Sequence, residues 1–453
     1  WYSGFNGINW KIGLATANAL PAAGNFPTPT PTPTPQPEPA PTTKIVVIPG
    51  LGASWNADLL FNCEPGTGNE EWVMNELAKK VYDRLLQRLK KTGQTVLPFF
   101  YDWRRTPNQN ATELYKLIND NISQNETVDI VGHSMGGLVA RAYIEQRQDQ
   151  SRVDAFLAVG SPFGGSANAY SAWEGAQVPN NNLLVRFALN TIVHFCSLTH
   201  GTSVLDSIHA YAPSVRQLLP VYDYLRDEAT NELKSESDLF YRNEWLPNGF
   251  FTPPYHGIRI GTLAGTGYRT LTELIVKKPN KKQQSSGQWT DGKPVTKVFT
   301  LQGDGTVTLA SAQLAEADNR VLTLNHRALI SSKRGVDTIL DFFDYQPMNG
   351  AQKVNEPEPQ SALILMSDKA SFEIENPDKT VLKDENGMIA ITDPSSATRT
   401  VKIYPKTNNT RLVVAQLLED GETVWKEYKL KGKEMKLKKL IFNESNPLAD
   451  PLK

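Results

Sequence analysis

The sequence predicts an α/β fold with a mostly parallel sheet, followed by a smaller all-β domain. Three observations support this prediction. Short β-branched runs alternate with amphipathic helical segments from Lys44 onward, an alternation typical of parallel sheets with helices on both faces. A proline-rich stretch precedes this region, and short strand-like runs separated by turn residues follow it. With 453 residues, 40% of them hydrophobic, the chain has room for two or three globular domains.

The first 43 residues are not expected to belong to either domain. Residues 1–26 resemble the end of an upstream module or a processed N-terminal segment, because the mildly apolar stretch 12–23 lacks the basic segment that precedes a secretion signal. Residues 27–43 form a Pro/Thr-rich linker in which every second residue from 27 to 41 is proline. Such a segment is expected to be an extended polyproline spacer. Linkers of this kind are typical of modular proteins outside the cytoplasm, so the chain is expected to be secreted or to lie in the cell envelope or at the cell surface.

The region 44–346 carries the α/β pattern. Strands are expected at 44–48, 95–101, 128–131, 153–159, 257–264, 296–302 and 320–324, and helices at 72–91, 112–122, 136–146 and 336–343. The pattern breaks over about 164–255, where a lid or cap could be inserted. An ordinary helical insertion that buries its own apolar face is the alternative.

The region 347–453 has a different character. Strand-like runs are expected at 362–366, 371–374, 388–391, 401–404, 412–417 and 424–430, with turn residues between them. This spacing predicts a small antiparallel β-sandwich without an evident catalytic residue. The lysine-rich run 429–439 is best interpreted as a solvated strand edge.

Composition excludes some classes of protein. The formal net charge is −1, so no nucleic-acid partner is indicated. No run of 18 apolar residues occurs, so no transmembrane segment is expected. The two cysteines, Cys63 and Cys196, are too few for a disulfide scaffold, and the sequence leaves open whether they pair.

The segment 127–140 carries the decisive motif, Gly132-His-Ser134-Met-Gly136-Gly. A β-branched strand leads into it and a helix leads out, which is the setting of the nucleophile elbow in the α/β-hydrolase fold. The glycines two residues before and after Ser134 remove side chains that would clash in the strained turn. We therefore expect Ser134 to be a nucleophile, with the N–H of Met135 as an oxyanion donor.

A serine hydroxyl needs a base, and in this fold the acid and the histidine follow the serine in that order. Of six histidines, His326 alone follows a late strand and precedes the final helix. Asp304 lies in a Gly-Asp-Gly loop after the preceding expected strand, and Asp291 is the alternative acid. The turn Pro49-Gly-Leu51-Gly follows the first strand, so the N–H of Leu51 is the second expected oxyanion donor.

Together these segments resemble the lecithin:cholesterol acyltransferase-like group of α/β-hydrolases, which includes lysosomal phospholipase A2. The resemblance covers roughly 44–345. Besides the elbow and the Pro-Gly turn, it rests on the segments Tyr101-Asp-Trp-Arg104, 160–166 and Gly303-Asp-Gly-Thr-Val307, and on His326. It implies acyl chemistry on phospholipids or other lipid esters, with Ser134, Asp304 and His326 as the catalytic triad. It also implies a structural role for Arg104 and a substrate-covering lid at 164–255.

The expected activity is that of a serine esterase, lipase or O-acyltransferase working through an acyl-enzyme, with no metal or cofactor. The partner is a lipid or ester substrate, and the sequence leaves open whether it is met at a membrane or lipid interface. One alternative is transfer of the acyl group to an alcohol rather than to water. Another is a non-catalytic surface-binding protein on a hydrolase fold, which an intact triad argues against.

Overall fold

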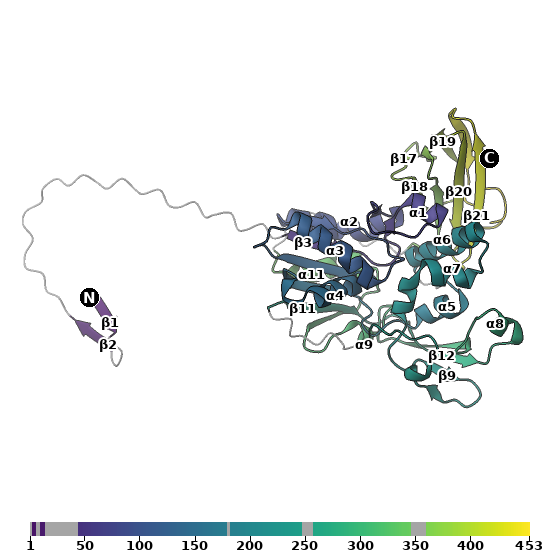
Figure 1. Cartoon of the computed structure of the whole chain (residues 1–453). Coiled ribbons are helices and arrows are strands. Elements are labelled where there is room, and N and C mark those ends of the chain that lie inside the picture. The colour runs from purple at the N-terminus through teal and green to yellow at the C-terminus, as the bar shows by residue number, and fades with distance from the viewer. Residues whose placement is uncertain (1, 6–9, 14–43, 179–181, 247–256, 346–358) are drawn as a thin grey trace, which may run out of the picture. The chain divides into compact units, whose positions relative to one another are not determined.

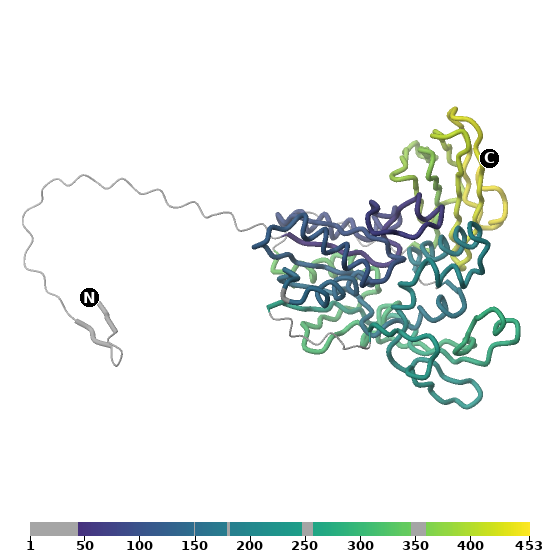
Figure 2. Tube along the Cα trace, in the orientation of Figure 1, coloured from purple at the N-terminus to yellow at the C-terminus, as the bar shows by residue number. Residues whose placement is uncertain are grey.

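The computed structural model describes residues 2–5, 10–13, 44–178, 182–246, 257–345 and 359–453 (Figures 1 and 2). It divides into two compact units, Trp1–Pro41 and Thr42–Lys453. In the first unit, β1 (Tyr2–Phe5) and β2 (Trp10–Gly13) pair in antiparallel fashion. Most of the expected N-terminal segment and the whole expected linker 27–43 lie outside the described residues.

The second unit is built on a six-stranded sheet in the order β14-β11-β8-β7-β3-β6, in which every neighbouring pair is parallel. Its strands are β3 (Lys44–Ile48), β6 (Thr95–Pro98), β7 (Val128–His133), β8 (Val153–Val159), β11 (Arg259–Gly265) and β14 (Asp318–Leu322). This parallel sheet, with the helices that cover it, confirms the predicted α/β-hydrolase fold.

Helices cover both faces of this sheet because its strands bury side chains on both. Val46 and Ile130 belong to one buried cluster together with residues of α3 (Pro107–Asn121) and α4 (Met135–Arg147). The alternating positions Ile45 and Val131 belong to the other cluster, with residues of α2 (Glu76–Lys91) and α11 (Lys333–Phe342). The short helix α10 (Ala328–Ser331) precedes α11. Helix α2 begins later than predicted because Val73–Met74 forms β5, which pairs with β4 (Ser54–Trp55), and Asn75 caps the helix by accepting from the N–H of Leu77.

The segment between β8 and β11 is mainly helical and includes part of a second sheet. Its elements are α5 (Asn168–Gly175), α6 (Leu183–His200), α7 (Val204–Tyr211), the 3-10 turns Pro213–Leu218 and Glu236–Asp238, β9 (Leu225–Asp227) and β10 (Leu233–Lys234). The second sheet has the order β10-β9-β12-β13, with β12 (Thr270–Lys277) and β13 (Lys293–Thr300) joined through α8 (Lys281–Ser285) (Figure 1). The strand predicted at 296–302 therefore exists but lies outside the central sheet.

A disulfide joins two distant parts of the catalytic region. Cys63 ends α1 (Ala57–Asn62), and Cys196 lies in the buried half of α6. Their sulfur atoms are bonded across 133 residues of sequence, which answers the question that the sequence left open. The remaining short elements are the 3-10 turn Gln148–Gln150 and α9 (Leu309–Ala312). None of the helices in the described ranges is both long and apolar enough to cross a membrane.

Two antiparallel four-stranded sheets form the predicted C-terminal β-sandwich. One has the order β18-β15-β20-β21 and the other β17-β16-β19-β22. The strands are β15 (Ala362–Met366), β16 (Ala370–Glu375), β17 (Val381–Lys383), β18 (Met388–Thr392), β19 (Arg399–Pro405), β20 (Asn409–Leu417), β21 (Thr423–Lys431) and β22 (Lys436–Leu440). The sequence predicted six of these strands and missed β17 and β22.

Candidate active site

Ser134 lies in a sharp turn between β7 and α4. Its backbone has φ 55° and ψ −126°, a conformation that costs energy for any residue with a side chain and that is held here by the surrounding structure. A Cβ at Gly132 would lie 2.6 Å from the Cα of Gly137, and one at Gly136 would lie 2.2 Å from the carbonyl oxygen of Ile48. The glycines of the motif are therefore sterically required, and the geometry is that of a nucleophile elbow.

His326 and Asp304 form a buried pair. The Nδ1 atom of His326 lies 2.7 Å from Oδ2 of Asp304. The other carboxylate oxygen, Oδ1, accepts the N–H groups of Thr306 and Val307 at 2.8 and 2.7 Å. The backbone N–H of His326 also donates to the carbonyl oxygen of Asp304. The loop amides thus hold the carboxylate so that one oxygen is directed at the imidazole, as a triad acid requires.

The strand that precedes Asp304 is not part of the central sheet, contrary to the expectation from the sequence. Asp304 follows β13, which belongs to the second sheet, and a bridge with Tyr268 brings its loop back to the end of β11. A Cβ at Gly265, the last residue of β11, would lie 2.6 Å from the Cβ of Asp304. The predicted residue is thus in place, although the strand before it is not a neighbour of β14. The alternative, Asp291, accepts the N–H groups of Phe240 and Tyr241 instead.

Ser134 and the His326–Asp304 pair meet at the carboxyl edge of the parallel sheet. Ser134 and His326 line one pocket together with Gly50 and Leu51. The N–H of Ser134 donates to the last residue of β8, Val159. A Cβ at Gly160, the next residue, would lie 3.1 Å from Nδ1 of His326 and 3.2 Å from Oδ2 of Asp304. The pair is therefore packed against the strand that neighbours Ser134.

The turn after β3 passes close to the candidate nucleophile. A Cβ at Gly50 would lie 2.9 Å from the Cβ of Ser134 and 3.4 Å from its Oγ. Leu51 follows in the same turn, is buried, and lines the pocket. Met135 is the first residue of α4. The two expected oxyanion donors thus lie close to Ser134: Leu51 in the adjacent turn and Met135 directly after it.

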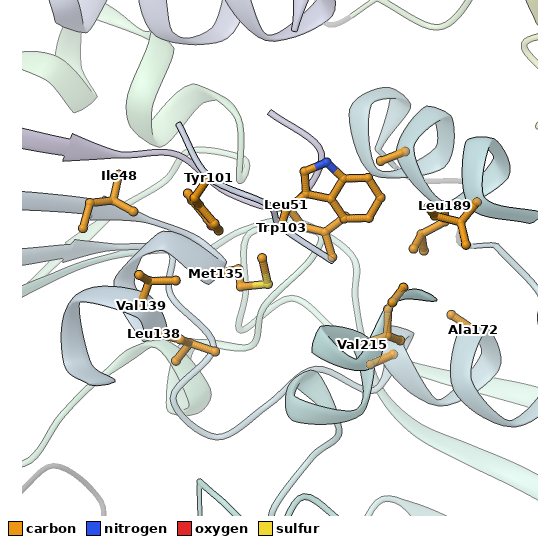
Figure 3. Close-up of a cluster of buried hydrophobic side chains, with 14 of the residues drawn as sticks. Ile48, Leu51, Tyr101, Trp103, Met135, Leu138, Val139, Ala172, Leu189 and Val215 are labelled. Atoms are coloured by element: carbon orange, nitrogen blue, oxygen red, sulfur yellow. The ribbon is translucent and has the colours of Figure 1, made fainter. Parts of the chain in front are cut away.

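The Tyr-Asp-Trp-Arg segment supports this turn from behind. The hydroxyl of Tyr101 donates to the carbonyl oxygen of Pro49 at 2.8 Å, and the indole N–H of Trp103 donates to that of Ser54 at 3.1 Å. Figure 3 shows Tyr101 and Trp103 in the same cluster of buried side chains as Leu51 and Met135. Sequence reasoning did not identify Ser54 as a residue that supports this turn.

Arg104 is buried rather than exposed, since only 2% of its surface is accessible. Its Nε and one terminal nitrogen both donate to the carboxylate of Asp102, at 2.8 Å each. Such a bidentate pair fixes the orientation of both groups. The pair stabilises the loop that follows β6, and the anchoring role that the family resemblance implies for Arg104 stays a prediction.

Four other histidines lie in the described part of the chain, and each has another partner. His194 contacts Glu427, His200 the carbonyl oxygen of Cys63 and His209 that of Trp173. His133 contacts Tyr82. His256 lies outside the described residues. Tyr82, on the buried face of α2, is a residue near the site that sequence reasoning missed, because its position there indicates packing alone.

This is an α/β-hydrolase-fold protein in which Ser134, His326 and Asp304 lie at the carboxyl edge of the central sheet. Its sequence is also similar to known proteins. Residues 67–243 match the family model of lecithin:cholesterol acyltransferase. The match includes the nucleophile elbow at 132–137 and supports the resemblance seen in the motifs.

Two relatives of known name illustrate the similarity. The human lysosomal phospholipase A and acyltransferase is 28% identical over 296 residues, which are 60% of this chain and 63% of that protein. The mouse phosphatidylcholine-sterol acyltransferase is 33% identical over 144 residues, 28% of this chain and 32% of the relative. The chain thus spans less than two thirds of the length of these relatives. Among solved structures, the mature lipase BlEst2 of Bacillus licheniformis has a TM-score of 0.34 and 15% identity, over 70% of this chain and 96% of that one.

Proposed function

We propose that this protein is a serine hydrolase or acyltransferase that cleaves ester bonds of lipid-like substrates through an acyl-enzyme. The observation that carries the proposal is the 2.7 Å contact between Asp304 and His326, where His326 lines the same pocket as Ser134. The printed names of the human and mouse relatives, a phospholipase and acyltransferase and a sterol acyltransferase, support a lipid ester as the substrate class.

In the proposed mechanism, His326 takes the proton of Ser134 as Oγ attacks the ester carbonyl carbon. Asp304 holds the imidazole in the required tautomer and stabilises its charged form. The N–H groups of Leu51 and Met135 stabilise the negative oxygen of the tetrahedral intermediate. His326 then gives the proton to the leaving alcohol, and water or a second alcohol releases the acyl group. No step needs a metal or cofactor.

The proposed domain organisation assigns a part to each region. Residues 44–346 form the catalytic domain, residues 347–453 the sandwich, and 27–43 the linker to the segment 1–26. The insertion at about 164–255 serves as a cap, which is supported by four residues at the start of α6 that line the pocket: Asn182, Leu183, Leu184 and Val185. A bonded cysteine pair and the proline-rich linker support a secreted or cell-surface location, because disulfides persist outside the reducing cytosol.

Labelling with a fluorophosphonate probe tests the proposal. The wild-type chain is expected to be labelled and to hydrolyse p-nitrophenyl esters, whereas Ser134→Ala is expected to do neither. Ser285→Ala, which removes a hydroxyl from the exposed helix α8, is the matched control and should behave as wild type. A wild-type chain without labelling or esterase activity would favour the non-catalytic surface-binding alternative. Undiminished labelling of Ser134→Ala would exclude Ser134 as the nucleophile.

Two further measurements refine the reaction. Phospholipid liposomes compared with soluble short-chain esters test whether the substrate is met at a lipid interface. Product analysis with an added long-chain alcohol tests transfer against hydrolysis: an alkyl ester indicates transfer, and free fatty acid alone indicates hydrolysis. Both comparisons keep Ser134→Ala as the baseline.

A further inference from the structure

A chain of buried hydrogen bonds runs behind Ser134. The N–H of Gly50 lies 2.9 Å from the hydroxyl oxygen of Tyr82. The same oxygen lies 2.7 Å from Nδ1 of His133, and Nε2 of His133 lies 3.2 Å from the carbonyl oxygen of His326. The side chains of Tyr82 and His133 are almost completely buried. Two side chains therefore connect three separate loops of the site.

The donor and the acceptor of each hydrogen bond in this chain can be assigned. The carbonyl oxygen of His326 can only accept, so Nε2 of His133 carries a hydrogen. Burial holds the pKa of His133 well below its usual value, and the nearby His326 lowers it further, so the ring is neutral and its Nδ1 has no hydrogen. Nδ1 must then accept from the hydroxyl of Tyr82, whose oxygen in turn accepts from Gly50. All of these groups are satisfied at once.

The three connected loops are those that carry the proposed chemistry. Gly50 precedes Leu51, whose N–H is the proposed oxyanion donor. His133 precedes Ser134, and its ring lies 4.8 Å from that of His326. The buried residues of α2 are Leu77, Ala78, Val81, Tyr82, Leu85 and Leu89, and the side-chain hydroxyl of Tyr82 is the one polar group among them. A polar group on an otherwise apolar helix face is informative because an unpaired one would be costly.

We propose that Tyr82 and His133 are positioning residues. They hold the turn with Leu51, the elbow with Ser134 and the base His326 in their correct relative positions. Tyr82 fixes the Gly50 amide, and His133 transmits that constraint to the backbone of His326. Neither group exchanges a proton with the substrate. The proposal rests on the proposed function, because these relative positions matter only if Ser134, His326 and the oxyanion donors act together.

Tyr82→Phe tests the proposal because it keeps the aromatic packing and removes the hydroxyl alone. We expect kcat for a p-nitrophenyl ester, normalised to titrated active sites, to fall on the order of 10- to 100-fold, since small displacements of reacting groups carry losses of that size. KM should change by less than about twofold, because phenylalanine keeps the ring that lines the pocket and the hydroxyl of Tyr82 is already paired with Gly50 and His133. Tyr143→Phe is the matched control: it removes a buried hydroxyl that donates to the carbonyl oxygen of Ser151, away from the site.

A double-mutant cycle separates a connected chain from two independent packing residues. His133→Leu should lower kcat as Tyr82→Phe does, and the double variant should lose no more than the worse single variant. His133→Gln, whose amide can both accept from Tyr82 and donate to His326, should recover part of the loss. Additive losses in the cycle, or a Tyr82→Phe variant with wild-type kcat, would overturn the proposal.

The outcome is distinguishable from failure of the proposed function. If the wild-type chain is not labelled by the fluorophosphonate and has no esterase activity, the function itself is wrong. If the wild type is active, Ser134→Ala is inactive and Tyr82→Phe matches Tyr143→Phe, the function stands and the positioning role is refuted. Thermal midpoints of all variants show whether a loss of kcat follows from a loss of folded protein.

Discussion

The disulfide between Cys63 and Cys196 is expected to stabilise the fold and the shape of the site together. Cys63 lies at the end of α1 with a left-handed backbone (φ 51°), and Cys196 lies in α6, whose first turn lines the pocket that contains Ser134. Both side chains are buried. Removal of the bond should therefore lower stability and loosen the helix that forms one wall of the site.

The separation of the two cysteines sets the expected size of the effect. A cross-link over 133 residues removes about 17 cal/mol/K of entropy from the unfolded chain, or about 5 kcal/mol at 25 °C. Measured effects of native disulfides are typically 2–4 kcal/mol, because unfolded chains retain some structure. We expect a loss of roughly 2–5 kcal/mol in the free energy of unfolding, large against typical domain stabilities of 5–15 kcal/mol.

Denaturant unfolding of wild type and of Cys63→Ala/Cys196→Ala measures this loss, with and without reductant. The wild type should unfold at lower denaturant when reduced, while the double variant should not respond to reductant. Hydrogen exchange should show the largest loss of protection in α1 and α6. A wild-type midpoint that does not change on reduction, after thiol titration has verified that the bond was broken, would refute the reasoning.

Two further predictions concern buried carboxylates. Asp304→Asn should lower kcat by about 10³- to 10⁴-fold with little change in thermal midpoint, because the amide can still contact His326 but favours the wrong tautomer; an activity loss below tenfold would count against the triad. Burial raises the pKa of Asp129 to about 6, against the favourable hydrogen bond from Tyr345. Because this pKa is higher in the folded than in the unfolded protein, the folded state binds the proton of Asp129 more tightly. Protonated Asp129 therefore contributes to stability below about pH 4, and this contribution is lost as the pH rises to about 6. Asp129→Asn should therefore raise the thermal midpoint at pH 7.5, by the equivalent of up to about 3 kcal/mol, and this gain should shrink toward pH 4.5; an equal effect at both pH values would contradict the burial argument.

Most of the candidate site could be predicted from the sequence, because the fold restricts the positions at which its functional residues can lie. Ser134 was predictable from a motif that only a strained strand–helix turn requires. His326 followed from its place between the last strand and the last helix. Asp304 does contact His326, but it was selected for an incomplete reason, since β13 belongs to the second sheet. A loop position can be inferred from its glycines even where the parent strand is misplaced.

Other features could not be predicted because their causes are not local. The pairing of Cys63 with Cys196 depends on how α6 packs against α1, which no sequence spacing reveals. Tyr82 was hidden because a tyrosine on an apolar helix face is normally explained by packing, and its hydroxyl gains a partner only when the turn at Gly50 is in place. Strand β22 has the sequence Lys-Leu-Lys-Lys-Leu, and such a lysine-rich pattern at a sheet edge resembles a solvated charge run.

The C-terminal sandwich contributes to the site although it contains no triad residue. Strand β15 is buried along its whole length, because its sheet packs against the other sheet of the sandwich on one face and against the catalytic region on the other. Seven of its sheet's side chains join the main core cluster: Ala362, Ile364, Met366, Met388, Val413, Ala415 and Leu417. A sandwich attached only by a tether would instead present a polar outer face here.

Specific contacts show which part of the catalytic region the sandwich holds. Trp425 of β21 stacks on His194 of α6 at 4.6 Å between ring centroids and packs edge-on against Phe195. Arg411 of β20 donates to the carbonyl oxygen of Phe61, beside the disulfide, and lies over the ring of Phe195. These contacts involve the part of α6 that contains Cys196. The helix that lines the pocket is therefore fixed from two sides, by a covalent bond and by an apolar sheet, and the shape of the pocket depends on residues about 290 positions beyond Ser134 in the chain.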